Sequence, residues 1–144
     1  MKKIICVALS ICCIIHAHAI ESTIVKNIDS SVSCGNVQNN TQWWTAISLS
    51  IRMGERTSDF EDCHIRILQE DRVITIFTEE TFKLISVADE TLREDEDGII
   101  YQVRKCVDED GKKCLATFMY YPAKYIFLIV EFNDVAICYV VQPD

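Results

Sequence analysis

The chain has 144 residues, of which 22 are acidic and 14 are basic, so its net charge is −8. This length predicts one domain that is large enough to bury a hydrophobic core. The acidic balance argues against binding to nucleic acids or to anionic membranes, and it is compatible with a cationic ligand or partner.

The first nineteen residues have the pattern of a secretory signal peptide. Lys2 and Lys3 precede an apolar run over residues 4–15, and residues 17–19 form an Ala-His-Ala cleavage pattern. A membrane anchor is the alternative, but the apolar run is about half the roughly 20 residues that a span requires. We therefore expect a secreted, extracellular protein of residues 20–144 that forms a single domain and has no membrane span.

Five of the eight cysteines remain in the mature chain: Cys34, Cys63, Cys106, Cys114 and Cys138. In an oxidising compartment, cysteines are expected to form disulfides rather than metal sites or catalytic thiols. An odd number allows at most two bridges within the chain. Cys106 and Cys114 flank a predicted turn and could lie opposite each other, and Cys138 is within plausible reach of either.

Residues 20–42 are polar and weakly patterned, which predicts an irregular lead-in that is compatible with a short helix. This segment contains a glycosylation sequon at Asn39. From Trp43 onward, alternating apolar residues and short polar turns predict about eight strands. The expected strands are residues 43–51, 63–68, 72–78, 82–87, 99–105, 115–121, 125–132 and 135–141.

Tight turns separate the later strands. Asp97-Gly98 and Asp110-Gly111 are hairpin signals, and Asn133-Asp134 marks another tight turn. Such local connections favour an all-β antiparallel meander, which hides its edges best when it closes into an up-and-down barrel. An immunoglobulin-like β-sandwich is the alternative, supported by Asp97-Gly98-x-x-Tyr101 but opposed by Val103, where a cysteine would be expected.

Motifs for catalysis and for metals are missing from the sequence. The acidic runs before Gly98 and Gly111 lack the ligand spacing of a calcium loop, because Arg93 and Cys106 stand at their first positions. His64 is the single histidine of the mature chain, and no G-x-S-x-G motif or zinc-ligand spacing is present. We therefore expect a protein that is not an enzyme and that carries neither a metal nor a cofactor.

Residues 125–141 resemble the late paired strands of a lipocalin. Their ending, Cys138-Tyr139-Val140-Val141, is similar to that of the salivary lipocalins of ticks and related blood-feeding arthropods. The resemblance extends over most of residues 43–141 but is specific near the C-terminus. It implies a barrel that binds a small ligand.

The resemblance also implies a disulfide framework. The family bridges the late cysteine to one about thirty residues earlier, which favours Cys106 over Cys114 as the partner of Cys138. A cysteine opens the family's second strand, as Cys63 does here. Because the family's C-terminal helix and tail cysteine are not present, Cys34 becomes the expected partner of Cys63.

The sequence departs from the family at two further places. Thr41-Gln42-Trp43 stands in place of the family's Gly-x-Trp, and Tyr139 stands where amine-binding members have an acidic residue. Amine binding therefore does not simply carry over from the family. We expect a carrier or scavenger of lipid mediators, fatty acids or biogenic amines, with lipids favoured slightly because the strand faces are mostly apolar. The alternative is a secreted module that blocks a host or other extracellular protein.

The sequence does not identify the inner face of each strand, so the candidate ligand-binding residues are chosen by type. Trp43 and Trp44 are each also compatible with a purely structural position in the hydrophobic core. The candidates are Trp43, Trp44, Tyr101, Arg104, Tyr120, Tyr121 and Glu131.

Overall fold

The computed structural model describes residues 41–122 and 125–144. The predicted signal peptide, Cys34 and the sequon at Asn39 lie outside the described residues. Within them, no helix is long and apolar enough to cross a membrane. The strands are β1 (Gln42–Met53), β2 (Arg56–Thr57), β3 (Glu61–Gln69), β4 (Val73–Phe77), β5 (Phe82–Ser86), β6 (Thr91–Glu94), β7 (Ile100–Val107), β8 (Lys113–Tyr120), β9 (Ile126–Glu131) and β10 (Val135–Pro143).

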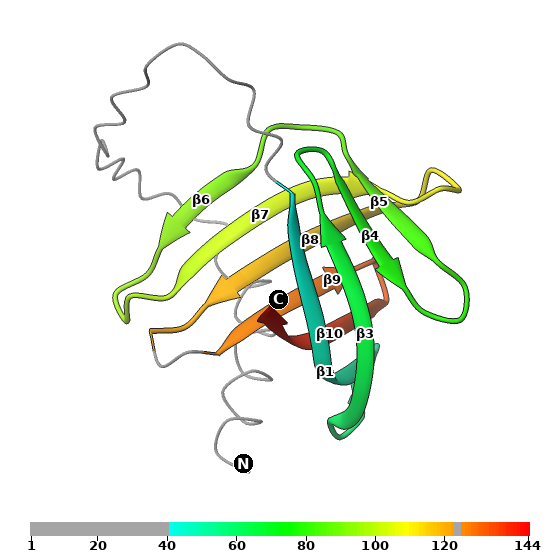
Figure 1. Cartoon of the computed structure of the whole chain (residues 1–144), viewed down its shortest axis with the longest axis horizontal. Coiled ribbons are helices and arrows are strands. Elements are labelled where there is room, and N and C mark those ends of the chain that lie inside the picture. Colours follow the sequence, from blue (N-terminus) through cyan, green and yellow to red (C-terminus); the bar gives the residue numbers. More distant parts are fainter. Residues whose placement is uncertain (1–40, 123–124) are drawn as a thin grey trace. The chain divides into compact units, whose positions relative to one another are not determined.

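Eight of these strands form one closed antiparallel barrel (Figure 1). Each strand pairs with the next around the barrel, in the order β1, β3, β4, β5, β7, β8, β9 and β10. The pairing of β10 with β1 closes the sheet over nine residue pairs, from Trp44 with Pro143 to Met53 with Val135. The predicted barrel is therefore confirmed, and a single closed sheet excludes the two-sheet sandwich.

The eight predicted strands coincide with the eight strands of the barrel to within a few residues. The two short strands that were not predicted, β2 and β6, lie outside the ring and pair with β1 and β7. Both Asp-Gly turns form hairpins, and Gly98 and Gly111 have φ values of 76° and 79°. Glycine adopts such positive φ angles without the steric cost that other residues incur.

An aspartate side chain closes each of these two hairpins. Asp95 Oδ1 accepts hydrogen bonds from the backbone N–H groups of Asp97 and Ile99, at 3.0 and 2.9 Å. Asp108 Oδ1 does the same for Asp110 and Lys112, at 3.0 and 2.8 Å. The acidic runs are therefore hairpin tips, as the sequence predicted.

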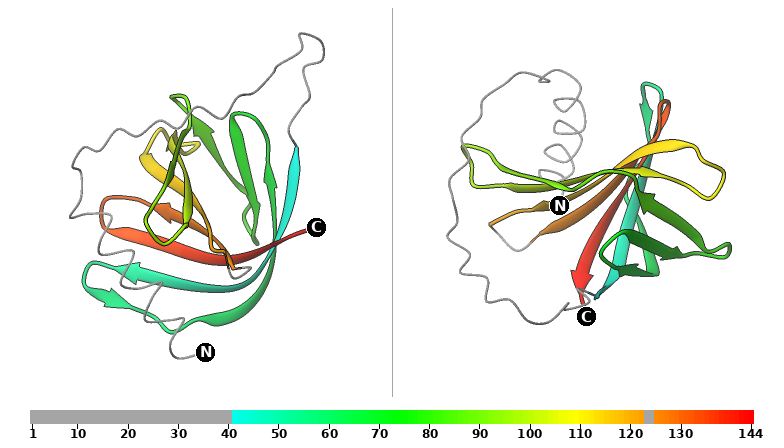
Figure 2. Two further views of the ribbon diagram at one scale, coloured as in Figure 1. Left: turned by 90° about the vertical axis from the view of Figure 1, so that its left-hand side faces the viewer. Right: turned by 90° about the horizontal axis from the view of Figure 1, so that it is seen from above.

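Two further views show the strands curving around a common interior (Figure 2). Alternation along the strands directs one set of apolar side chains into this interior, where they form the buried core. The register places inward residues of neighbouring strands side by side, as with Phe118 and Leu128 or Ala116 and Val130. The strand β1 changes register between Ala46 and Ser48, a bulge that lets it pair with both β3 and β10. Among the most deeply buried inward residues are Ile67, Ile74, Ile76, Leu84, Ala116, Phe118, Leu128 and Val130.

The outer face of β8 and β9 is also buried and is mostly apolar. Met119 pairs with Phe127, and Thr117 pairs with Ile129, on the face opposite to the interior. These four residues are buried as well. Strands that are buried on both faces read as continuous apolar runs, so alternation alone does not reveal which side is inside.

The register separates the cysteines. Cys106 and Cys114 are paired across β7 and β8, and both face the interior, whereas Cys138 lies on the outer face of β10. No disulfide joins any two of the cysteines in the described residues. A bridge requires Cα atoms within about 7 Å and side chains that point toward each other, so this barrel does not accommodate the expected bridge from Cys138 to Cys106 or Cys114.

The other expected bridge joins Cys34 to Cys63. Cys63 lies on β3 and faces the interior of the barrel. Its Sγ donates a weak hydrogen bond to the Ala46 carbonyl at 3.5 Å. Burial raises the pKa of the Cys63 thiol. Because Cys34 lies outside the described residues, this bridge stays a prediction.

The filled interior predicts a large loss of stability when Phe118 is truncated. Phe118 is fully buried, and its ring packs 5.3 Å from that of Trp44. Phe118→Ala should lower the free energy of unfolding by about 3–5 kcal/mol. Urea unfolding measures this, with Ile85→Ala on the outer face as the control. A loss as small as that of the control would contradict a packed interior.

Burial of Tyr139 predicts a loss of stability at alkaline pH. Burial raises the pKa of Tyr139 to about 12, above its ordinary value of 10.0. As the pH rises past about 10, the unfolded chain releases this proton first, so unfolding is favoured by about 1.4 kcal/mol per pH unit up to about pH 12. Tyr139→Phe should remove that part of the slope in urea unfolding between pH 8 and 11. Tyr125→Phe, at an exposed tyrosine, should leave the slope unchanged, and equal slopes for both variants would refute the assignment.

Candidate functional site

A pocket of about 240 Å³ opens at the end of the barrel where β1 begins and β3 ends. Polar side chains line it, in contrast to the apolar interior beyond. They come from the start of β1, the end of β3 and the turn after it, the segment before β6, and β7. The lining residues are Thr41, Gln42, Gln69, Asp71, Glu90, Gln102 and Arg104.

Arg104 is the charged group at the centre of this site. It follows Gln102 by two residues on β7, so both side chains point into the barrel. Its Nη1 donates to the carbonyl oxygens of Glu70 and Asp71, both at 3.0 Å, and its Nη2 forms an ion pair with Glu90 Oε2 at 3.0 Å. The Arg104 side chain is 6% exposed, so this cation is held by partners rather than by bulk water.

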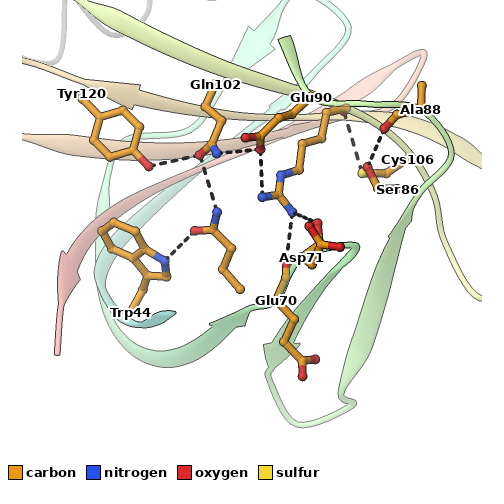
Figure 3. Close-up of polar contacts among 11 residues, drawn as sticks. Trp44, Glu70, Asp71, Ser86, Ala88, Glu90, Gln102, Cys106 and Tyr120 are labelled. Atoms are coloured by element: carbon orange, nitrogen blue, oxygen red, sulfur yellow. Dashed lines mark hydrogen bonds and ion pairs between the residues drawn. The ribbon is translucent and has the colours of Figure 1, made fainter. Parts of the chain in front are cut away.

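A chain of hydrogen bonds connects the ion pair to the aromatic interior (Figure 3). Gln102 donates to Glu90 Oε2 at 2.7 Å, and its own Oε1 accepts a bond from the Tyr120 hydroxyl at 3.2 Å. Gln69 donates to the same Gln102 oxygen at 3.5 Å and accepts from Trp44 Nε1 at 3.0 Å. Gln69 and Gln102 therefore both have partners, and a continuous series of hydrogen bonds connects Glu90 to Trp44.

The segment between β5 and β6, residues 87–90, carries Glu90 to the pocket. Ser86 Oγ donates to the Ala88 carbonyl at 3.1 Å, which turns the chain after β5. Arg72 and Asp89 form an exposed ion pair at 3.3 Å, which is worth little in water. The Glu90 side chain is 40% exposed. It is therefore the more solvated and more easily moved partner of the Arg104–Glu90 pair.

Three of the seven predicted ligand-binding residues meet inside the barrel. Arg104 lines the pocket, and Trp44 and Tyr120 lie next to it, with ring centroids 6.4 Å apart. Burial, followed by the nearby Glu90 carboxylate, raises the pKa of Tyr120, although Arg104 opposes the shift. Tyr120 is therefore a neutral hydrogen-bond donor at physiological pH.

Trp43 and Tyr101 lie on the outer face of the barrel. Trp43 stacks on Phe77, with ring centroids 5.7 Å apart, and the Arg66 guanidinium lies 4.8 Å from its ring. The Tyr101 hydroxyl donates to Asp95 Oδ2 at 2.9 Å. Burial and this hydrogen bond raise the pKa of Tyr101.

Tyr121 and Glu131 also lie away from the pocket. Tyr121 packs edge-on against Phe127, with centroids 5.4 Å apart, and Phe127 belongs to the outer face of β9. Glu131 Oε1 forms an ion pair with Arg52 Nη2 at 3.2 Å, and Glu131 pairs with Leu115 on the outer face. Neither residue lines the pocket.

Sequence reasoning missed most of the residues that line the pocket. Gln69 stands two residues after the apolar Ile67 on β3, and Gln102 stands two before Arg104 on β7. These period-two positions were a usable signal. Glu90 and Asp71 lie in connections between strands, where no periodicity points to the interior.

The pocket combines amides, carboxylates and a guanidinium, so it can form directed hydrogen bonds with a small polar molecule. Comparisons of the chain with protein-family models, with curated proteins and with solved structures find no match.

The network predicts that loss of the Gln102 amide perturbs both stability and Trp44. Gln102→Leu leaves the Tyr120 hydroxyl and the Gln69 amide without their acceptor, which should lower the free energy of unfolding by about 1–3 kcal/mol. Urea unfolding followed by tryptophan emission measures both effects. Gln142→Leu, at an exposed position of β10, is the control. If the two variants behave alike, the network has no energetic role.

Proposed function

We propose that this is a secreted small-ligand-binding protein, a carrier or scavenger whose ligand enters the polar pocket at the end of the barrel. The buried Arg104 in that pocket is the observation that carries the proposal. A barrel of eight strands has an interior that is just wide enough for side chains or for one small ligand. Ligand sites typically place a few polar groups at such a mouth.

The lining favours compact polar ligands over long-chain lipids. The pocket measures about 240 Å³, and apolar side chains such as Phe118 and Leu128 occupy the interior. A fatty acid chain would have to displace them. Among the classes that the sequence suggested, compact ligands therefore suit the pocket better than long-chain fatty acids.

The resemblance to lipocalins remains part of this proposal. A closed antiparallel barrel of eight strands is compatible with that family, and a ligand at the open end of the barrel agrees with it. Secretion, glycosylation at Asn39 and an origin in saliva are likewise proposals.

One surface supports the alternative, a module that binds another protein. Trp43 and Phe77, each 37% exposed, stack on the outer face beside Arg66. Aromatic and arginine side chains are enriched at the centres of protein interfaces. This cluster would serve as an anchor if the barrel acted only as a scaffold.

Titration of two single-tryptophan variants tests the ligand-binding proposal. In Trp43→Phe, emission comes from Trp44, which is coupled to the pocket, whereas Trp44→Phe retains the outer tryptophan as a control. Compact acids, amines and alcohols, together with fatty acids and eicosanoids, should be titrated into the secreted protein. We expect compact ligands to change Trp44 emission and to leave Trp43 emission unchanged.

Native mass spectrometry of the same preparation provides a second readout. A co-purified small molecule would support the carrier function. An empty barrel, together with no response of Trp44 to any ligand class, would refute it and favour the protein-binding alternative.

A further inference from the structure

The Arg104 guanidinium uses only half of one of its hydrogen-bonding edges. Nε and Nη2 lie along the same edge, which binds a carboxylate through two parallel N–H···O bonds. Nη2 forms an ion pair with the Glu90 carboxylate at 3.0 Å, but Nε is buried and has no hydrogen-bond partner among the described residues. A buried donor without an acceptor costs about 1–3 kcal/mol. This edge is therefore ready for a carboxylate that contacts both nitrogens.

The opposite part of the guanidinium is already fixed. Nη1 donates to two carbonyl oxygens of the turn after β3, at the Glu70 and Asp71 positions. Arg104 is thus oriented by backbone groups, which do not leave when a ligand arrives. A preorganised donor of this kind reduces the entropy that binding would otherwise cost.

Glu90 has the features of a displaceable internal substitute for a ligand. Its carboxylate contacts Arg104 through a single oxygen, and Gln102 donates to that same oxygen at 2.7 Å. Glu90 is 40% exposed and lies on a connecting segment, whereas Arg104 is 6% exposed and lies within β7. An incoming carboxylate can therefore replace Glu90 while Glu90 moves into water.

A cationic ligand fits these groups less well. An ammonium group that captured Glu90 would remove the counter-ion of Arg104 and leave two cations together at a buried site. Removing one partner of a buried ion pair is strongly destabilising. Asp71 also lines the pocket and could attract an ammonium group, so amines form an arm of the test.

We propose that the ligand of this pocket is a compact organic carboxylate, which binds the Nε–Nη2 edge of Arg104 and displaces Glu90. The proposal deepens the ligand-binding function and rests on it. The volume of about 240 Å³ limits the ligand to a short acid rather than a long-chain one.

Three probes with the same tail and different heads test the proposal: hexanoate, hexylamine and hexanol. They are titrated into full-length secreted protein carrying Trp43→Phe, so that Trp44 reports binding. We expect hexanoate to bind at least about tenfold more tightly than either other probe, which corresponds to about 1.4 kcal/mol.

Glu90→Gln tests the displacement itself. The variant removes the competing charge and leaves an amide oxygen of similar size beside Arg104. Because Arg104 loses its counter-ion, the free energy of unfolding should fall, and circular dichroism checks that the protein is still folded under the titration conditions. Hexanoate should then bind about tenfold more tightly, and hexylamine should not gain. Glu80→Gln, at an exposed position between β4 and β5, removes a carboxylate remote from the pocket and should leave hexanoate binding unchanged.

The outcomes separate this proposal from the broader function. If hexylamine or hexanol binds as tightly as hexanoate, or if Glu90→Gln does not strengthen hexanoate binding, the carboxylate assignment is wrong and the pocket remains a ligand site. If other compact ligands bind and none of the three probes does, the assignment is also wrong. If no ligand class changes Trp44 emission, both the assignment and the ligand-binding function fail.

Discussion

A guanidinium buried inside a β-barrel determines how the open end of this barrel is built. Transfer of a charge out of water costs several kcal/mol unless partners replace the lost hydration. Arg104 obtains these partners from two separate connections, through the backbone carbonyls after β3 and the Glu90 carboxylate before β6. One side chain on β7 therefore fixes the positions of two connections that are distant in sequence.

The side-chain amides of Gln69 and Gln102, like the Arg104 guanidinium, need hydrogen-bond partners inside the barrel. Gln102 and Gln69 are inward-facing, and a buried amide is costly unless its donors and acceptors are satisfied. The two amides hydrogen-bond to each other. They also form hydrogen bonds with Glu90, Tyr120 and Trp44. The result is a polar layer across the mouth, above an apolar interior that begins at Trp44 and Phe118. The barrel thus changes from polar to apolar within a few residues along β7 and β8.

The strands and the closed barrel could be predicted from sequence because alternation and Asp-Gly turns are local signals. The faces could not be assigned, since β9 carries apolar residues on both sides and either side could have been the interior. Tyr120 and Tyr121 show the consequence. They are adjacent and chemically identical, yet one joins the pocket network and the other packs on the outer face. Only the pairing register between strands resolves this.

The cysteines and Glu90 show a second limit. The resemblance to lipocalins implied, by its spacing of about thirty residues, that Cys138 pairs with Cys106, but spacing does not record which face a side chain occupies. Cys106 instead lies opposite Cys114, and two strands separate it from β10. Glu90 lies in a connection with no repeating pattern, so its role depends on where β5 and β6 place it. Such contacts depend on the tertiary structure, and no repeating pattern in the sequence predicts them.

The polar mouth is easier to explain by recognition than by stability. Apolar residues of similar volume in place of a buried ion pair often leave a protein equally stable or more stable. Within the part of the chain that the structure describes, the Arg104 Nε also lacks an acceptor, at a further cost. A barrel that served only to display its outer surface, including Trp43 and Phe77, would gain nothing from that arrangement. A barrel that binds a ligand at its mouth would gain an oriented donor pair, and this difference favours ligand binding over the scaffold alternative.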